Sequence, residues 1–107
     1  MTVDELIASV ANDTEPPASL SEGAQALWHL KKGNWEESHN IAQDLHTPMG
    51  SWIHGLLHVI EGDQGNANYW FAKAGKPSCR LADADALWAQ IAAAVSYTHI
   101  RAHETEA

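Results

Sequence analysis

His54, His58 and Glu61 are the residues of this sequence whose types and spacing best suit them to chemistry. They stand at positions i, i+4 and i+7, so that on a helix they share one face. Two imidazoles one turn apart can bind Zn²⁺, and a carboxylate one turn later can supply a third ligand. His39 and His46 precede them in the chain and could approach the same region. The pattern therefore permits a zinc site formed by His54, His58 and Glu61.

The same histidines also fit a structural role at the boundary of the core, bonded to backbone groups or to carboxylates. Seven histidines in a chain of 107 residues will often align by chance. Metalloprotease helices carry a glutamate directly after the first histidine, and this chain has Gly55 there. We therefore predict no catalytic residue and no cofactor, with zinc at His54, His58 and Glu61 as the alternative.

Residues 52–74 must position these side chains, and their pattern predicts two amphipathic helices joined by the turn Gly62-Asp63. Asp63 is expected to cap the second helix, with Asn66 tightening the turn, and Gly75 to end it in a left-handed conformation. Apolar residues recur at spacings of three and four. They are Ile53, Leu56, Leu57 and Ile60 in the first helix, and Ala67, Trp70, Phe71 and Ala74 in the second.

The remaining residues also predict helices. Thr2, Ser21, Asn34 and Thr47 each stand before a helical pattern as N-caps. The first helix should bury Val3, Leu6, Ile7 and Val10, and the third Trp35, Ser38, Ile41, Ala42 and Leu45. Asp83 or Asp85 should cap a last helix. We expect an all-α single domain of about six helices over residues 1–94. It divides into an N-terminal helix and linker (1–20), one helical hairpin (21–48), a second hairpin (49–77) and a last helix (81–94).

An internal repeat supports this division. A shift of 29 residues places Leu27 on Leu56, His29 on His58, Gly33 on Gly62, Asn34 on Asp63, Ala42 on Phe71 and Pro48 on Pro77. Each unit then reads as helix, Gly-Asn or Gly-Asp turn, helix and proline. Small residues at fixed places are typical of two helices that approach closely.

The second unit resembles a tetratricopeptide-type helical hairpin. Gly62, Asp63, Ala67, Phe71 and Ala74 match that family in order and spacing, although the period of 29 is shorter than its usual 34. The resemblance covers about residues 21–94 and implies a short stack of antiparallel hairpins. The stretch from Trp52 to Gly75 also resembles a group of uncharacterised small bacterial proteins.

The C-terminal segment has a different origin in our interpretation. Residues 95–105 read V-S-Y-T-H-I-R-A-H-E-T and closely resemble one translated frame of a transposase-type sequencing adapter, with a difference only at Ile100. We therefore expect residues 95–107 to be a non-native tail, from a gene assembled from environmental reads. His99 and His103 lie in this tail, so we exclude them as metal ligands.

The composition narrows the classes of partner. A formal net charge of −8 and six scattered cations are unsuited to nucleic acid or to an anionic membrane surface. Cys79 is the one cysteine and cannot form an internal disulfide, which favours a cytoplasmic location. Its cationic neighbours Lys76 and Arg80 could make it a reactive thiolate, but no base accompanies it and a passive thiol is the simpler interpretation.

The leading functional hypothesis is a non-catalytic helical-repeat module that binds a protein or peptide partner. Stacked hairpins leave a groove that commonly takes a peptide or a helix. The expected binding face contains Trp28, Trp52, His54, His58 and Glu61, although the spacing of both tryptophans also fits packing in the core, less clearly for Trp52. A small metal-binding protein or enzyme that uses the His54, His58 and Glu61 face is the alternative, and a homodimer that buries an exposed tryptophan is a third hypothesis.

Overall fold

The chain is all-helical in the computed structural model, which describes the backbone of residues 1–106 and the side chains of residues 1–95. The elements run α1 (Val3–Asn12), α2 (Glu22–Lys32), α3 (Trp35–Asp44), α4 (Pro48–Ile60), α5 (Gln64–Ala74), the 3₁₀ turn η1 (Leu81–Asp83) and α6 (Ala84–Glu106). The predicted all-α class with about six helices is therefore confirmed over the described residues.

Local hydrogen bonds set most helix starts at the predicted residues. Thr2 and Glu5 form a complete capping box, with Thr2 Oγ1 accepting from the Glu5 N–H at 3.1 Å. Side-chain caps are also present at Ser21, Thr47 and Asp63. Asn34 precedes α3 but makes no side-chain cap bond. At the start of the last helix, η1 ends at Asp83 and leads directly into α6, whose first turn contains Asp85.

The turns of the two repeat units have the same backbone structure. Gly33 and Gly62 both adopt a left-handed conformation, with φ of 98° and 90°, which costs a glycine little. Two hydrogen bonds close each turn at positions 29 residues apart. They are Gly33 N to Leu30 O (3.1 Å) and Asn34 N to His29 O (2.8 Å), and Gly62 N to Val59 O (3.1 Å) and Asp63 N to His58 O (2.9 Å). The sequence repeat is thus also a repeat of backbone geometry.

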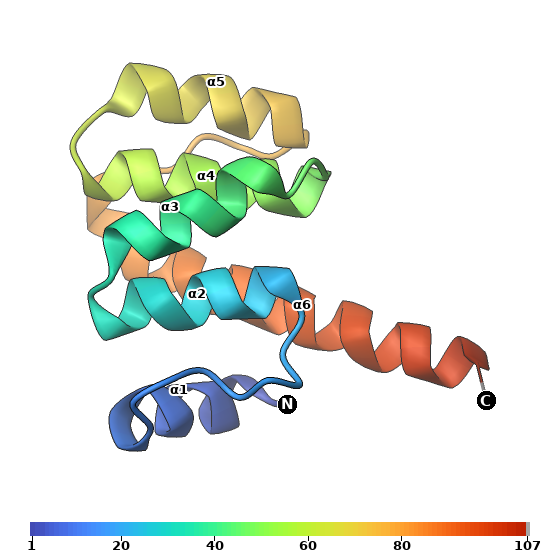
Figure 1. Ribbon diagram of the computed structural model, residues 1–107. Helices are drawn as coiled ribbons and strands as arrows, with labels where there is room; N and C mark the ends of the chain where they lie inside the picture. The colour runs from blue at the N-terminus through green and yellow to red at the C-terminus, as the bar shows by residue number, and fades with distance from the viewer. Residues whose placement is uncertain (107) are drawn as a thin grey trace.

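The helices pack as a compact stack (Figure 1). α2 contacts α3, α4 contacts α5, and α3 contacts α4 between the two pairs. α6 lies against α4, α2 and α1, whereas α1 packs on α2. This packing is consistent with the predicted helical stack and places α3 and α4, which carry most of the candidate site, at the centre.

Tryptophan side chains tie the helices together through indole hydrogen bonds. Trp28 donates to Ser9 Oγ at 3.0 Å, linking α2 to α1. Trp88 donates to the Leu27 carbonyl at 3.0 Å, linking α6 to α2. Both indoles are buried and their N–H groups are satisfied, as a stable core requires.

Some predicted core residues lie at the surface. Ile7 and Ile60 are 40% and 39% exposed, although their spacing placed them on apolar faces. Ile7 stands at the edge of its stripe, whereas Ile60 is the last residue of α4. Five more of the predicted inward residues are half-buried: Val3, Trp35, Ile41, Leu45 and Trp70.

The predicted non-native tail begins at Val95, which is buried, and the side chains of its other residues lie outside the described part of the structure. His99 and His103 are among them. In the part that is described, no helix combines the length and apolar character needed to cross a bilayer.

Candidate metal centre

Three histidines from two helices meet where α3 packs on α4. His39 comes from α3, and His54 and His58 come from α4. One ring nitrogen of each lies within 4.8 Å of the others. The ring centroids are 4.7 Å apart for His39 and His54, 4.8 Å for His54 and His58, and 5.5 Å for His39 and His58. His54 and His58 are buried and His39 is half-buried, so the cluster opens toward solvent on the α3 side.

Trp35 fixes the place of His39. Its indole N–H donates to the Leu57 carbonyl at 2.9 Å, so that the start of α3 is bonded to α4. His39 lies one turn further along α3, and its ring stacks on the Trp35 ring at 4.8 Å with an interplanar angle of 9°. The same indole therefore joins the two helices and holds the imidazole over His54 and His58.

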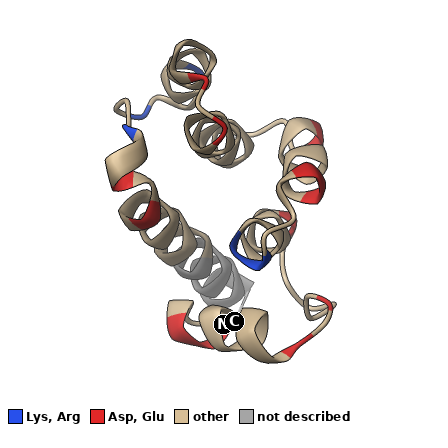
Figure 2. Ribbon diagram, turned by 90° about the vertical axis from the view of Figure 1, so that its left-hand side faces the viewer, with Lys and Arg blue, Asp and Glu red and all other residues tan. Residues whose placement is uncertain are grey.

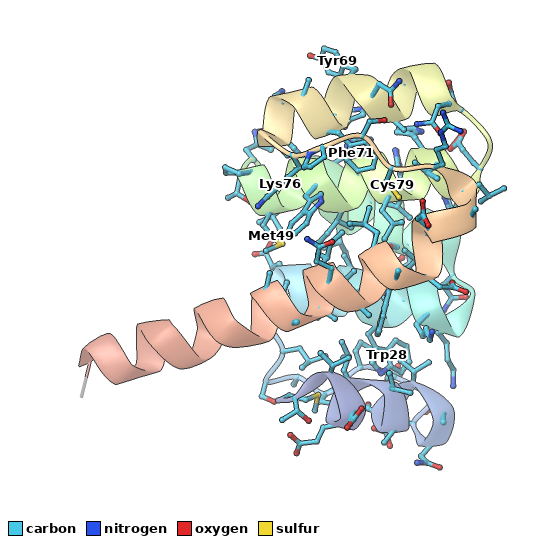
Figure 3. The ribbon with its side chains drawn as sticks, turned by 180° about the vertical axis from the view of Figure 1, so that it is seen from behind. Trp28, Met49, Tyr69, Phe71, Lys76 and Cys79 are labelled. Carbon is cyan, nitrogen blue, oxygen red and sulfur yellow. The ribbon has the colours of Figure 1, made fainter. Side chains whose placement is uncertain are left out.

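Trp70 of α5 covers the other side of the cluster. Its ring stacks on His54 with centroids 3.9 Å apart and an interplanar angle of 13°. α5 comes this close because Gly55 has no side chain: a Cβ there would lie 2.7 Å from the Phe71 ring. Figure 3 shows Phe71 pointing from α5 toward α4, whereas Tyr69 points away from the molecule. Gly55, which interrupts a protease-like pattern, is thus required for packing.

Glu61 contacts one member of the cluster. Its Oε2 lies 3.2 Å from Nδ1 of His58, and the pair makes a hydrogen bond whose donor depends on the tautomer. Glu61 and Asp63 form a second potential ligand group with His58, which does not include His54. The structure therefore places His39, and not Glu61, beside both histidines of α4.

The environment of His54 favours its neutral form. The pKa of His54 is lowered from 6.5 to about 4, chiefly by burial and to a smaller extent by electrostatic interactions with His39, His58 and Lys73. A neutral imidazole has a free lone pair, which is the form that binds a metal ion. At neutral pH His54 therefore needs no deprotonation to act as a ligand.

The two tryptophans of the expected binding face are core residues. Trp28 is 0% exposed and Trp52 is 4% exposed, so neither offers a surface to a partner. The indole of Trp52 is covered by Lys76, whose Nζ lies 4.3 Å from the ring centroid. Their burial agrees with the core positions that their spacing allowed. It does not agree with their place on a binding face, because other elements cover the helix faces that carry them.

His46 does not join the cluster, although it stands near His39 in the chain. It is exposed and lines a separate hollow of about 470 Å³ with Ser51, Trp70 and Lys73 among others. The sequence indicated that His39 and His46 could both approach the region of His54 and His58, and in the structure His39 does so and His46 does not.

Cys79 is not activated. It is buried, and its Sγ lies 3.3 Å from the Arg80 carbonyl. Figure 3 shows it in the segment that connects α5 to η1. Burial raises the pKa of the Cys79 thiol, and the negative charge of Asp83 raises it further. The thiol stays protonated near neutral pH, as the passive interpretation requires.

Comparison of the chain with models of protein families, with curated proteins and with solved structures gives no match.

Proposed function

We propose that this protein binds a divalent transition metal ion through His39, His54 and His58. One observation carries the proposal: three imidazole nitrogens from two helices lie within 4.8 Å of one another in a largely buried position. Buried polar groups normally face a partner. The ring of His54 packs against two other imidazoles and the face of an indole.

Zn²⁺ is the metal that we expect. Imidazole ligands suit zinc, copper, nickel and iron, and the cluster contains no thiolate that would select a softer ion. Zinc–nitrogen bonds of about 2.1 Å place two ligands of a tetrahedral ion about 3.4 Å apart. The three nitrogens must therefore approach one another by at most about 1.4 Å, which small rotations of the three rings can supply.

Zinc titration of the metal-free protein by calorimetry tests this proposal. The chain should carry His99→Ala and His103→Ala, so that the C-terminal histidines cannot bind the ion. We expect one Zn²⁺ per chain and at least a tenfold loss of affinity in both His39→Ala and His58→Ala. Circular dichroism checks that each variant is folded.

His46→Ala is the matched control, because it removes a histidine close in sequence but outside the cluster. It should bind zinc like the parent. Equal affinities in His46→Ala and His58→Ala, or no binding at all, would refute the metal site.

The repeated turn geometry supports a second proposal, that the protein is a tetratricopeptide-like module for a protein or peptide partner. The hydrogen bonds at Gly33 recur at Gly62 with the same spacing. Acidic side chains are spread over several helices (Figure 2), which suits neither nucleic acid nor an anionic membrane. Tyr69, 60% exposed on the outer side of α5, is the aromatic contact that we expect.

Affinity capture with the immobilised chain, compared with Tyr69→Ala, tests the module. Proteins retained by the parent and lost with the variant would support it. Sedimentation of the parent and of Tyr69→Ala tests whether the partner is a second copy of the chain. A parent that is monomeric and retains no protein would contradict both the module and the homodimer.

A further inference from the structure

We infer that a metal ion held by the three histidines keeps one open coordination position, which takes water or a small monodentate anion. The inference rests on the proposed metal binding and adds what the centre does with its fourth site. Zinc centres with four protein ligands are closed, whereas three protein ligands leave a position for an exchangeable molecule.

The donor set supports an open position. Among residues 1–95, the group that contains His39, His54 and His58 includes no fourth histidine, cysteine, aspartate or glutamate. Glu61, which follows the last residue of α4, bonds to His58 Nδ1. A carboxylate bonded to one ring nitrogen orients the ring and leaves the other nitrogen for the metal. Glu61 is thus placed to orient the ligand His58, and it is not itself a ligand of the metal.

The surrounding side chains leave one direction of approach. Trp70 covers the ring of His54 from α5, and Trp35 covers the ring of His39 along α3. Both indoles lie nearly parallel to the imidazoles that they touch, so they hold the ring planes in place. Because His39 is half-buried whereas His54 and His58 are buried, a small molecule would enter beside His39.

The charge of the centre favours an anion. Three neutral imidazoles leave a divalent ion with its full double charge. Lys73 lies over the outer face of Trp70, with its Nζ 4.9 Å from the ring centroid, and adds a further positive charge nearby. A bound water on such an ion loses a proton far more readily than bulk water. Hydroxide or another small anion is therefore the expected occupant.

Cobalt substitution tests the open position. Co²⁺ replaces Zn²⁺ in tetrahedral sites, and its visible bands respond to each change of ligand. The chain with His99→Ala and His103→Ala is loaded with one Co²⁺, and sodium azide is added as the probe anion. We expect bands typical of four-coordinate Co²⁺ that shift with saturation at one azide per metal, with the same shift in His46→Ala.

Glu61→Gln separates the two possible roles of the acid. If Glu61 bonds to His58 and does not bind the metal, Glu61→Gln should weaken metal binding about 10- to 100-fold and leave the azide response intact. If the parent ignores azide and Glu61→Gln becomes responsive, Glu61 is the fourth ligand and the inference is overturned.

A parent that binds Co²⁺ through the three histidines but shows no spectral change with azide also overturns the inference and leaves metal binding standing. Failure to bind Co²⁺ or Zn²⁺, by contrast, refutes the proposed function itself. His58→Asn, which keeps a small polar side chain, replaces His58→Ala if the alanine variant is unfolded.

Discussion

Replacement of His54 by leucine should remove a pH dependence from the stability of the metal-free protein. The imidazole has a pKa of about 4 in the folded chain and 6.5 as its reference value, chiefly because it is buried. Below pH 6.5 the unfolded chain gains a proton at this residue that the folded chain does not. The free energy of unfolding therefore falls as the pH drops from 6.5 toward 4, and this residue has no such effect above pH 7.

The size of the effect follows from the two pKa values. Each pH unit between them is worth about 1.4 kcal/mol. Between pH 7 and pH 5 the full shift corresponds to about 1.8 kcal/mol, and screening by solvent on the half-buried His39 side reduces this to about 1–1.5 kcal/mol. The other groups that face His54 and contribute to its shift are His58 and Lys73.

Urea unfolding followed by tryptophan fluorescence at pH 5, 6 and 7, with chelator present, measures the effect. The stability of the parent should fall by about 1–1.5 kcal/mol more than that of His54→Leu across this range. Carboxylates titrate equally in both proteins and cancel in the comparison. His46→Leu, which alters an exposed histidine, should keep the slope of the parent. Parallel curves for the parent and His54→Leu would refute the assignment of a buried neutral imidazole.

Three further outcomes are expected. Gly55→Ala should destabilise the fold by about 1–3 kcal/mol in urea, because its Cβ would lie 2.7 Å from the Phe71 ring. Gly65→Ala is the matched control, since no atom lies within 4 Å of a Cβ there. It should leave stability unchanged or raise it by up to about 1 kcal/mol. Equal effects of the two changes would contradict the packing role of Gly55. Ser38→Ala should cost about 1–2 kcal/mol in the same assay, because Ser38 Oγ donates to the buried Ala26 carbonyl at 2.7 Å, and an unchanged midpoint would show that this bond is not needed. For the predicted foreign tail, the codons of residues 95–105 should match the adapter, and synonymous codons unlike it would reject that origin.

The local features of the fold were predictable from short stretches of sequence. A cap, a left-handed glycine or a proline at a helix start acts through hydrogen bonds and sterics within about five residues. For this reason Thr2, Ser21 and Thr47 cap their helices as expected, and Gly33 and Gly62 form equivalent turns. The 29-residue repeat could be read for the same reason, because it repeats these local signals.

Burial depended on neighbours that the spacing does not specify. Trp28 and Trp52 were expected on a binding face and are in the core, whereas Ile7 and Ile60 were expected in the core and are partly exposed. An apolar residue at the edge of a stripe, such as Ile7, or at the end of a helix, such as Ile60, is covered only if another helix reaches it. That depends on how α1, α5 and α6 pack, which is decided by contacts between distant segments.

The candidate site likewise combines a feature that the local sequence determines with one that only the tertiary structure determines. The spacing of His54 and His58 by itself determines that both project from one face of a helix, because an i, i+4 pair is separated by about one turn. Glu61 one turn later looked like the third ligand, yet it bonds to His58 alone. The tertiary structure brings His39 to the pair instead, since the Trp35 indole bonds α3 to the Leu57 carbonyl and sets the position of the next turn. A third ligand from another helix depends on this packing, and no periodicity within one helix contains it.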